Sequence, residues 1–285
     1  MVDAHLHVWH AVSHATPWRP GWARHAHGPR FQVEDATRAM EGAGVARAIL
    51  IPAAWDVRGN ELVEEAARRF PERFAAFPVA DLRSPLDAAA LRSWMERPGV
   101  LGLRQMFPPG VRSRLEDGSA DWLWPAAEAA GVPLMLWMPG QLRHLGPILR
   151  RHPRLRVTLD HLNLGMGPTS SERATALREL CALADLPNLA VKASALPCLA
   201  PEETYPYPSA QRLVRQVVDA FGARRVFWGS DLGRLPCSYR QAVSMVLEGS
   251  AGLSEGEVAL VMGQAILEWL GWGPQTASEA PAPGR

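Results

Sequence analysis

Asp3-Ala4-His5-Leu6-His7-Val8-Trp9 opens the chain and places two imidazoles two residues apart. Side chains alternate between the two faces of a strand, so His5 and His7 point to the same side of an extended segment. Two imidazoles on one side can converge on a metal ion or on the reacting atom of a substrate. The same spacing also fits a polar segment that contains histidine by chance, so the rest of the chain must decide.

Length and composition limit the class of protein. The chain has 285 residues, 47% of them hydrophobic, which is enough for one α/β barrel or for two smaller domains. The net charge is +1, with no basic stripe interleaved with aromatics, so we expect a small-molecule substrate and no nucleic-acid partner. The composition leaves a homo-oligomer open.

Cellular location is predicted from cysteines and apolar runs. The three cysteines have no metal-type spacing, which favours a reduced, cytoplasmic setting. No apolar run approaches the roughly 18 residues that a membrane-spanning helix needs, so we expect no membrane partner. The first strand candidate follows Met1 directly, so we also expect no signal peptide.

Short apolar segments alternate with amphipathic segments along the chain. The predicted strands are residues 2–8, 46–52, 74–80, 99–105, 133–138, 155–161, 189–196 and 225–231. The predicted helices are residues 34–43, 60–70, 85–96, 120–130, 140–151, 171–184, 209–221 and 254–270. The last of these begins with the capping-box spacing of Ser254 and Glu257.

Eight strand–helix repeats in a chain of this length favour a closed (β/α)8 TIM barrel. An open dinucleotide-binding sheet is the alternative, but its glycine fingerprint is missing, because Gly165-Met166-Gly167 lacks the third glycine. We therefore predict a single α/β domain over residues 1–272. Residues 273–285 are rich in Pro, Ala and Gly and are predicted to be a disordered tail.

Polar and ionisable residues gather at the predicted strand ends. The active site of a parallel barrel lies at the carboxyl ends of its strands. A histidine or aspartate in a barrel core costs desolvation energy unless it is paired, so packing alone does not explain so many of them. The residues that fall on or near these ends are His5, His7, Arg104, Asp160, His161, Lys192, Ser194, Ser230 and Asp231.

Lys192 is the only lysine in the chain; apart from histidine, every other basic side chain is arginine. Arginine is wider and always charged, whereas a buried lysine is a compact cation whose pKa can fall. Two interpretations stay open. In the first, Lys192 is a functional cation that lies near Asp231 or near a carboxylate of the substrate. In the second, Lys192 is one half of a structural ion pair in the barrel core.

Several motifs occur in one order along nearly the whole chain. They include Asp3-x-His5-x-His7, Gly102-Leu103-Arg104, Asp160-His161, Val191-Lys192-Ala193-Ser194 and Trp228-Gly229-Ser230-Asp231. Their order and spacing resemble the amidohydrolase-related family of metal-dependent TIM-barrel hydrolases. The resemblance is strongest to the branch of sugar lactonases and 2-pyrone-4,6-dicarboxylate lactonases.

The resemblance implies roles for the matched positions. Asp231 would be the general base that accepts a proton from the attacking water. His161 would polarise or protonate the substrate oxygen, and Arg104 has a planar fork that suits a substrate carboxylate. The implied ligands of a divalent metal, zinc or manganese, are His5, His7, His161 and Asp231. The predicted catalytic residues are Asp231, His161 and Lys192, and the predicted substrate-binding residues are Arg104, Trp9, Trp137 and Ser194.

The chain departs from the family pattern on the fifth predicted strand. That strand reads Leu134-Met135-Leu136-Trp137-Met138, without the histidine that many metal-dependent relatives carry there. Metal-free activity therefore stays open beside metal-assisted activity. We expect a hydrolase that acts on a small cyclic ester or related carbonyl compound, carboxylated in this interpretation. The alternative is a metal-dependent, non-oxidative decarboxylase of an aromatic or enoic acid.

Overall fold

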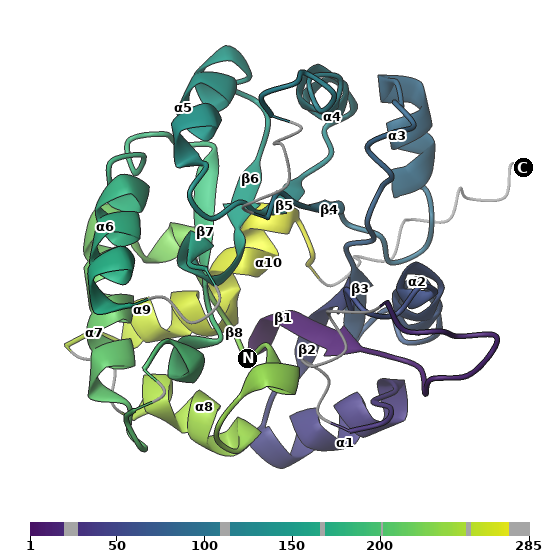
Figure 1. Cartoon of the computed structure of the whole chain (residues 1–285). Helices are drawn as coiled ribbons and strands as arrows, with labels where there is room; N and C mark the ends of the chain where they lie inside the picture. The colour runs from purple at the N-terminus through teal and green to yellow at the C-terminus, as the bar shows by residue number, and fades with distance from the viewer. Residues whose placement is uncertain (20–27, 109–114, 166–168, 201, 249–251, 274–285) are drawn as a thin grey trace, which may run out of the picture.

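The computed structural model describes residues 1–19, 28–108, 115–165, 169–200, 202–248 and 252–273. Eight parallel strands occupy the centre, and the helices surround them (Figure 1). The strands are β1 (Val2–Val8), β2 (Arg47–Pro52), β3 (Phe74–Ala76), β4 (Leu103–Met106), β5 (Leu134–Trp137), β6 (Val157–Leu159), β7 (Leu189–Ser194) and β8 (Val226–Gly229). All eight predicted strands are confirmed, although several are shorter than the apolar run that predicted them.

Backbone contacts close the strands into one barrel. The sheet pairing runs β1–β2–β3 and β4–β5–β6–β7–β8. Isolated bridges pair Ala76 with Val100 and Val79 with Arg104, which joins the segment around β3 to the segment around β4. On the opposite side, the Asp231 backbone N–H donates to the His5 carbonyl oxygen at 2.9 Å. The prediction of a (β/α)8 barrel in a single domain is confirmed.

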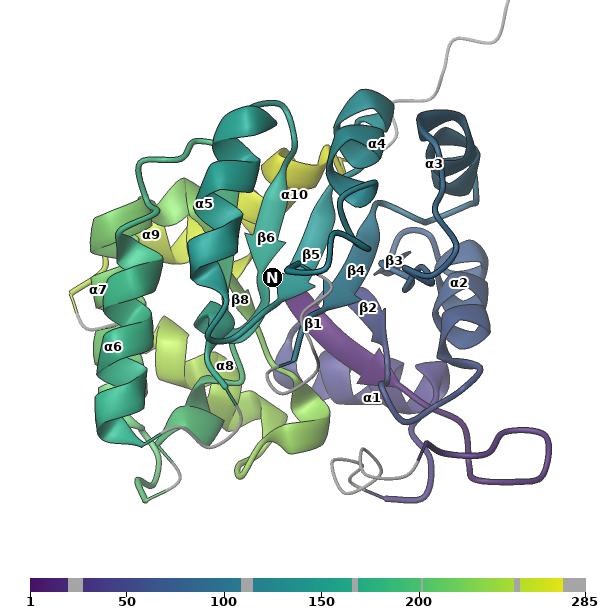
Figure 2. The same cartoon turned by 45° about the horizontal axis from the view of Figure 1, so that its top comes forward.

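The helices form the outer layer (Figure 2). They are α1 (Val33–Ala43), α2 (Gly59–Arg69), α3 (Ala88–Met95), α4 (Leu123–Ala130), α5 (Leu142–Arg151), α6 (Ser170–Cys181), α7 (Pro208–Phe221), α8 (Tyr239–Leu247), α9 (Glu255–Ala259) and α10 (Ala265–Leu270). Each of the longer ones buries an apolar stripe: on α1, for example, Val33, Ala36, Met40 and Ala43 are buried, at the spacing of one helix face.

Two helical segments differ from the prediction. α8 was not predicted, although Ser238 and Gln241 form a capping box at its start. The predicted last helix is divided by a π-helical turn, Leu260–Gln264, between α9 and α10. A Cβ on Gly263 would lie 2.7 Å from the Val2 nitrogen, so only glycine lets this turn pack so closely on β1.

The core lies in two layers. A large cluster fills the space between strands and helices, and a smaller one lies inside the barrel, with Ile49, Phe77 and Phe227 among its members. No helix of the described residues is long and apolar enough to cross a membrane. The predicted tail lies outside the described residues except for Gly273.

Candidate active site

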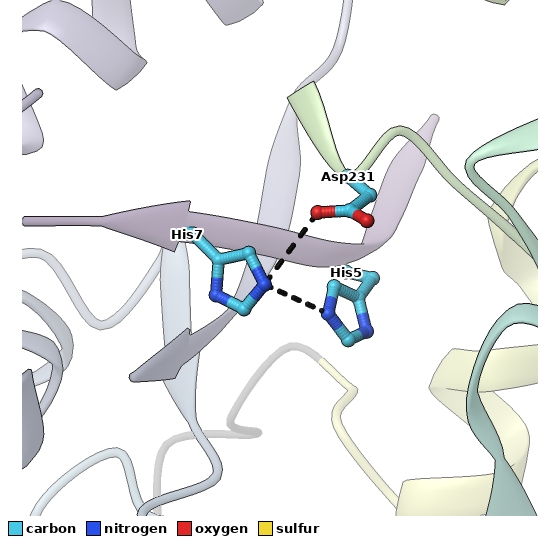
Figure 3. A group of neighbouring side chains, drawn as sticks. All are labelled: His5, His7 and Asp231. Carbon is cyan, nitrogen blue, oxygen red and sulfur yellow. Dashed lines mark hydrogen bonds and ion pairs between the residues drawn. The ribbon is translucent and has the colours of Figure 1, made fainter. Parts of the chain in front are cut away.

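His5, His7 and Asp231 meet where β1 and β8 come together (Figure 3). His5 Nε2 is 3.2 Å from His7 Nε2, and His7 Nε2 is 3.5 Å from Asp231 Oδ1. One donor atom from each residue lies within 4.8 Å of the other two, and all three residues are buried. Two imidazole nitrogens and one carboxylate oxygen at this spacing could hold a divalent metal ion.

A backbone contact orients His7 for this task. His7 Nδ1 is 2.8 Å from the Ile51 carbonyl oxygen, which can only accept, so Nδ1 carries the proton. Burial lowers the pKa of His7, which favours the neutral ring. The lone pair of Nε2 therefore points into the cluster, as metal coordination requires.

Asp231 combines an ionised carboxylate with an oxygen that has no donor. Burial raises its pKa, but the neighbouring His161, His7 and Arg234 outweigh burial and hold the pKa below its usual range. Its Oδ2 accepts a hydrogen bond from Arg234 Nη1 at 3.2 Å. Its Oδ1 accepts none from the described residues. A buried carboxylate oxygen without a donor, beside two imidazoles, fits a bound cation.

His161 lies on the other side of Asp231. It is in the turn after β6, with φ at 54°, and its Nε2 is 3.8 Å from Asp231 Oδ2. Burial lowers its pKa to about 4, so the ring is neutral near pH 7. The three-residue cluster does not include His161, so its predicted role as a ligand remains a prediction.

Ser194 orients His161. The Ser194 hydroxyl is 2.8 Å from His161 Nδ1 and accepts the His161 backbone N–H at 3.2 Å. Ser194 is fully buried, as are His5 and Asp231. The Ser194 hydroxyl thus contacts the histidine, and its predicted contact with the substrate stays a prediction.

Asp160 is a buried carboxylate that contacts two cationic side chains, Lys192 and Arg104. Asp160 Oδ1 is 2.9 Å from Lys192 Nζ, and Asp160 Oδ2 accepts from Arg104 Nε at 2.9 Å. Burial lowers the pKa of Lys192, and the contact with Asp160 opposes that change. Lys192 therefore pairs with Asp160 and not with Asp231, so the structural ion pair left open by the sequence is present.

The sequence profile of the Amidohydrolase family matches residues 2–272. This chain belongs to the amidohydrolase family. It is therefore an enzyme, and the cluster at the end of the barrel is its candidate active site.

Relatives of this amidohydrolase include a lactonase. An L-fucono-1,5-lactonase from Burkholderia ambifaria is 28% identical over 243 residues, which cover 81% of this chain and 79% of that protein. A crystal structure of a Burkholderia multivorans amidohydrolase with bound zinc superposes with a TM-score of 0.79 at 21% identity, covering 95% of this chain and 98% of that chain. The structure of a probable 2-pyrone-4,6-dicarboxylic acid hydrolase from Acinetobacter baumannii, with citric acid bound, gives a TM-score of 0.75 at 18% identity over 95% and 98% of the chains.

The two predicted aromatic contacts of the amidohydrolase are buried. Trp9 is 1% exposed and its ring stacks on Phe31, with Trp55 packed edge-on against it. Trp137 donates its indole N–H to the Leu164 carbonyl oxygen at 2.9 Å. Both tryptophans brace the loops around the site. Phe31 and Trp55 cover the Trp9 ring, and the predicted contacts of Trp9 and Trp137 with the substrate stay predictions.

Sequence reasoning missed the role of Asp3. Its carboxylate accepts the backbone N–H groups of His5 and Ser230, both at 2.9 Å, and the hydroxyls of Ser230 and Tyr239. Asp3 thereby ties β1, the end of β8 and the start of α8 together beneath the cluster. The motif marked Asp3, but nothing in the sequence pairs it with Tyr239, which lies 236 residues away.

Arg234 was also missed. Its guanidinium reaches back to Asp231 from three residues further along, across a turn in which Asp231 has φ at 51°. A charge three residues after a predicted general base is the signal that could have found it.

Proposed function

We propose that this amidohydrolase hydrolyses a small lactone, with Asp231 as the general base and with His5 and His7 holding a divalent metal ion beside it. The observation that carries this proposal is the Asp231 Oδ1 atom, which is buried without a donor from the described residues and faces His7 Nε2. Similarity to a fuconolactonase over most of the chain supports lactones as the substrate class.

The chemistry follows from the placement of the chain's own groups. Asp231 is ionised and accepts a proton from water as the water oxygen bonds to the lactone carbonyl carbon. The same carboxyl group then returns the proton to the ring oxygen as the ring C–O bond breaks, which gives a hydroxy acid. Neutral His161 would donate a hydrogen bond to a substrate oxygen. A metal ion held by His5, His7 and Asp231 would supply positive charge for the developing oxyanion.

A cavity lined in part by Arg104 is a candidate space for a substituent of the substrate; its lining does not include His5, His7, His161 or Asp231. It has a volume of about 480 Å³ and lies among the segments that follow β2, β3 and β4, with Asn60, Gln105 and Arg83 in its lining. This volume suits a small ring with one or two substituents. The Arg104 Nε bonds Asp160, whereas its two terminal nitrogens donate to no acceptor within the described residues.

Metal content tests the first part of the proposal. We expect protein purified without chelator to carry close to one equivalent of zinc or manganese by elemental analysis. Treatment with a chelator is expected to lower kcat/KM for lactones at least about a hundredfold, because a Lewis acid contributes several kcal/mol to transition-state stabilisation. Re-addition of the metal should restore activity. Full activity of a metal-free sample would assign the reaction to Asp231 and His161 alone.

Substitution of Arg104 tests whether the substrate carries a carboxylate that binds the guanidinium group. Replacing Arg104 with methionine is expected to raise KM for carboxylated lactones about tenfold or more, since a charge-assisted bidentate contact is lost. KM for neutral sugar lactones should change less. Arg83 lines the same cavity but already bonds Asp81, so Arg83→Met is the matched control. An equal rise in KM for both substrate classes would remove the carboxylate from the proposal.

The choice of substrate panel separates the two reactions considered from the sequence. Sugar lactones should be opened to hydroxy acids, and pyrone lactones to enol acids that convert to keto acids, in both cases with release of a proton. Aromatic and enoic acids should give no carbon dioxide. Release of carbon dioxide without lactone hydrolysis would replace this proposal with decarboxylation.

A further inference from the structure

His5 Nδ1 faces two groups of opposite hydrogen-bonding character. Lys192 Nζ lies 3.3 Å from Nδ1, and Asp160 Oδ1 lies 3.4 Å from it. The ammonium group can only donate, whereas an ionised carboxylate can only accept. Nδ1 of a neutral ring therefore either accepts from Lys192 or donates to Asp160, and it cannot do both.

The partner of Nδ1 decides whether the other ring nitrogen of His5, Nε2, carries a proton or a lone pair. The His7 contact with the Ile51 carbonyl oxygen fixes a lone pair on His7 Nε2, which lies 3.2 Å from His5 Nε2. If Nδ1 accepts from Lys192, His5 Nε2 carries the proton and donates it to His7. The two nitrogens then bond each other, and neither is available to a cation.

The opposite tautomer opens the site. If Nδ1 donates to Asp160, His5 Nε2 holds a lone pair, and two lone pairs face one another at 3.2 Å. That arrangement is unfavourable on its own, but it is the one that a cation needs. Exchange between the two tautomers moves a proton from Nε2 to Nδ1 and leaves the net charge of the ring unchanged.

We propose that Lys192 and Asp160 are opposed positioning residues that select the tautomer of His5 and thereby set how tightly His5, His7 and Asp231 hold a divalent metal ion. Lys192 favours the tautomer with the proton on Nε2, in which His5 and His7 bond each other and no cation is bound. Asp160 favours the tautomer with the proton on Nδ1, in which both Nε2 lone pairs are available to a cation. This inference rests on the proposed metal site and adds the residues that control it.

The surroundings of Lys192 explain why this position keeps a lysine. The side chain is fully buried, and its Nζ also contacts Met135 Sδ at 2.8 Å. Asp160 Oδ1, His5 Nδ1 and Met135 Sδ are three acceptors around Nζ, and they match the three donors of an ammonium group. A planar guanidinium is wider and holds its donors in a fixed fork, so it would not match the same three acceptors. The second Asp160 oxygen is held by Arg104, so only Oδ1 is shared between Lys192 and His5.

Nitrogen-15 NMR of the histidine rings tests the proposal on the unaltered protein. In the metal-free enzyme we expect the His5 signals to show a protonated Nε2 and an unprotonated Nδ1. With one equivalent of zinc, the proton should be on Nδ1. The chain has nine histidines, so the signals are assigned by their loss in His5→Gln. The ring of His7 is an internal reference, because its proton should stay on Nδ1 in both states.

Zinc affinity of two variants gives the second test. Lys192→Met should bind zinc up to about tenfold more tightly, since one competing hydrogen bond is gone. Asp160→Asn should bind zinc about 10–100-fold more weakly, as expected when the partner of a ligating histidine is lost. Met135→Leu removes the sulfur contact of the same ammonium group and leaves Asp160 and His5 in place, so it should match the wild type in both affinity and tautomer.

The outcomes separate this proposal from the metal site itself. Zinc binding without a change of His5 tautomer, or equal weakening in Lys192→Met and Asp160→Asn, would leave the site standing and overturn the tautomer control. A wild-type enzyme that binds no zinc would overturn both. Should a variant fail to fold, the NMR measurement on the wild type still decides.

Discussion

Asp231→Asn is expected to lower kcat for lactone hydrolysis by about 10²–10⁴-fold, because an amide cannot accept a proton from water. The substitution keeps the shape of the side chain and leaves one oxygen that can face His7. Asparagine also tolerates the left-handed backbone at this position, where φ is 51°. The fold should therefore persist. The measurement is steady-state kinetics on the lactone that the wild type hydrolyses fastest.

Asp231 has two proposed roles, as general base and as metal ligand, and two controls separate the loss of one role from the loss of the other. Thermal unfolding should give a melting temperature near that of the wild type, and elemental analysis should give the metal content of each protein. A loss of activity with the metal retained supports proton acceptance by Asp231. Near-normal kcat in Asp231→Asn would assign the general base to another residue.

Asp3→Ala is expected to lower the free energy of unfolding by about 3–5 kcal/mol, which is large for a single substitution. The carboxylate accepts four hydrogen bonds in a fully buried place, and alanine leaves those donors without a partner. The measurement is urea-induced unfolding followed by circular dichroism. The barrel should lose stability at the junction of β1, β8 and α8.

Tyr239→Phe is the matched control for Asp3, because it removes one of the four donors and keeps the ring that stacks on Trp228. Its cost should be about 1 kcal/mol. If Asp3→Ala were no more costly than Tyr239→Phe, the carboxylate would not tie the three elements together.

The sequence predicted the barrel well, and the reason is physical. Strands buried on both faces read as short apolar runs, and the helices between them bury one stripe each. Strand ends of a parallel barrel share one rim, so His5, His7 and Asp231 could be placed together before any contact was known. The α8 helix was missed because its apolar pattern is short.

The partners of the buried charges could not be predicted in the same way. Lys192 pairs with Asp160 because the register of β6 and β7 sets Leu159 beside Val191, and so brings the next residue of each segment together; patterns within single strands do not report that register. His161 reaches the Ser194 hydroxyl from a turn in which three successive residues after Asp160 adopt left-handed backbone conformations. Of the three residues, only Asn163 is of a type that favours this conformation, so the conformations of His161 and Leu162 depend on tertiary contacts.

The burial of Lys192 gives the chain a reporter of its own unfolding. No other lysine exists in the sequence, and this one is 0% exposed. An amine-reactive reagent can therefore reach a lysine only when the barrel opens far enough to break the Asp160 contact. The rate of that single modification, followed by mass spectrometry, measures opening of the barrel interior without any engineered label.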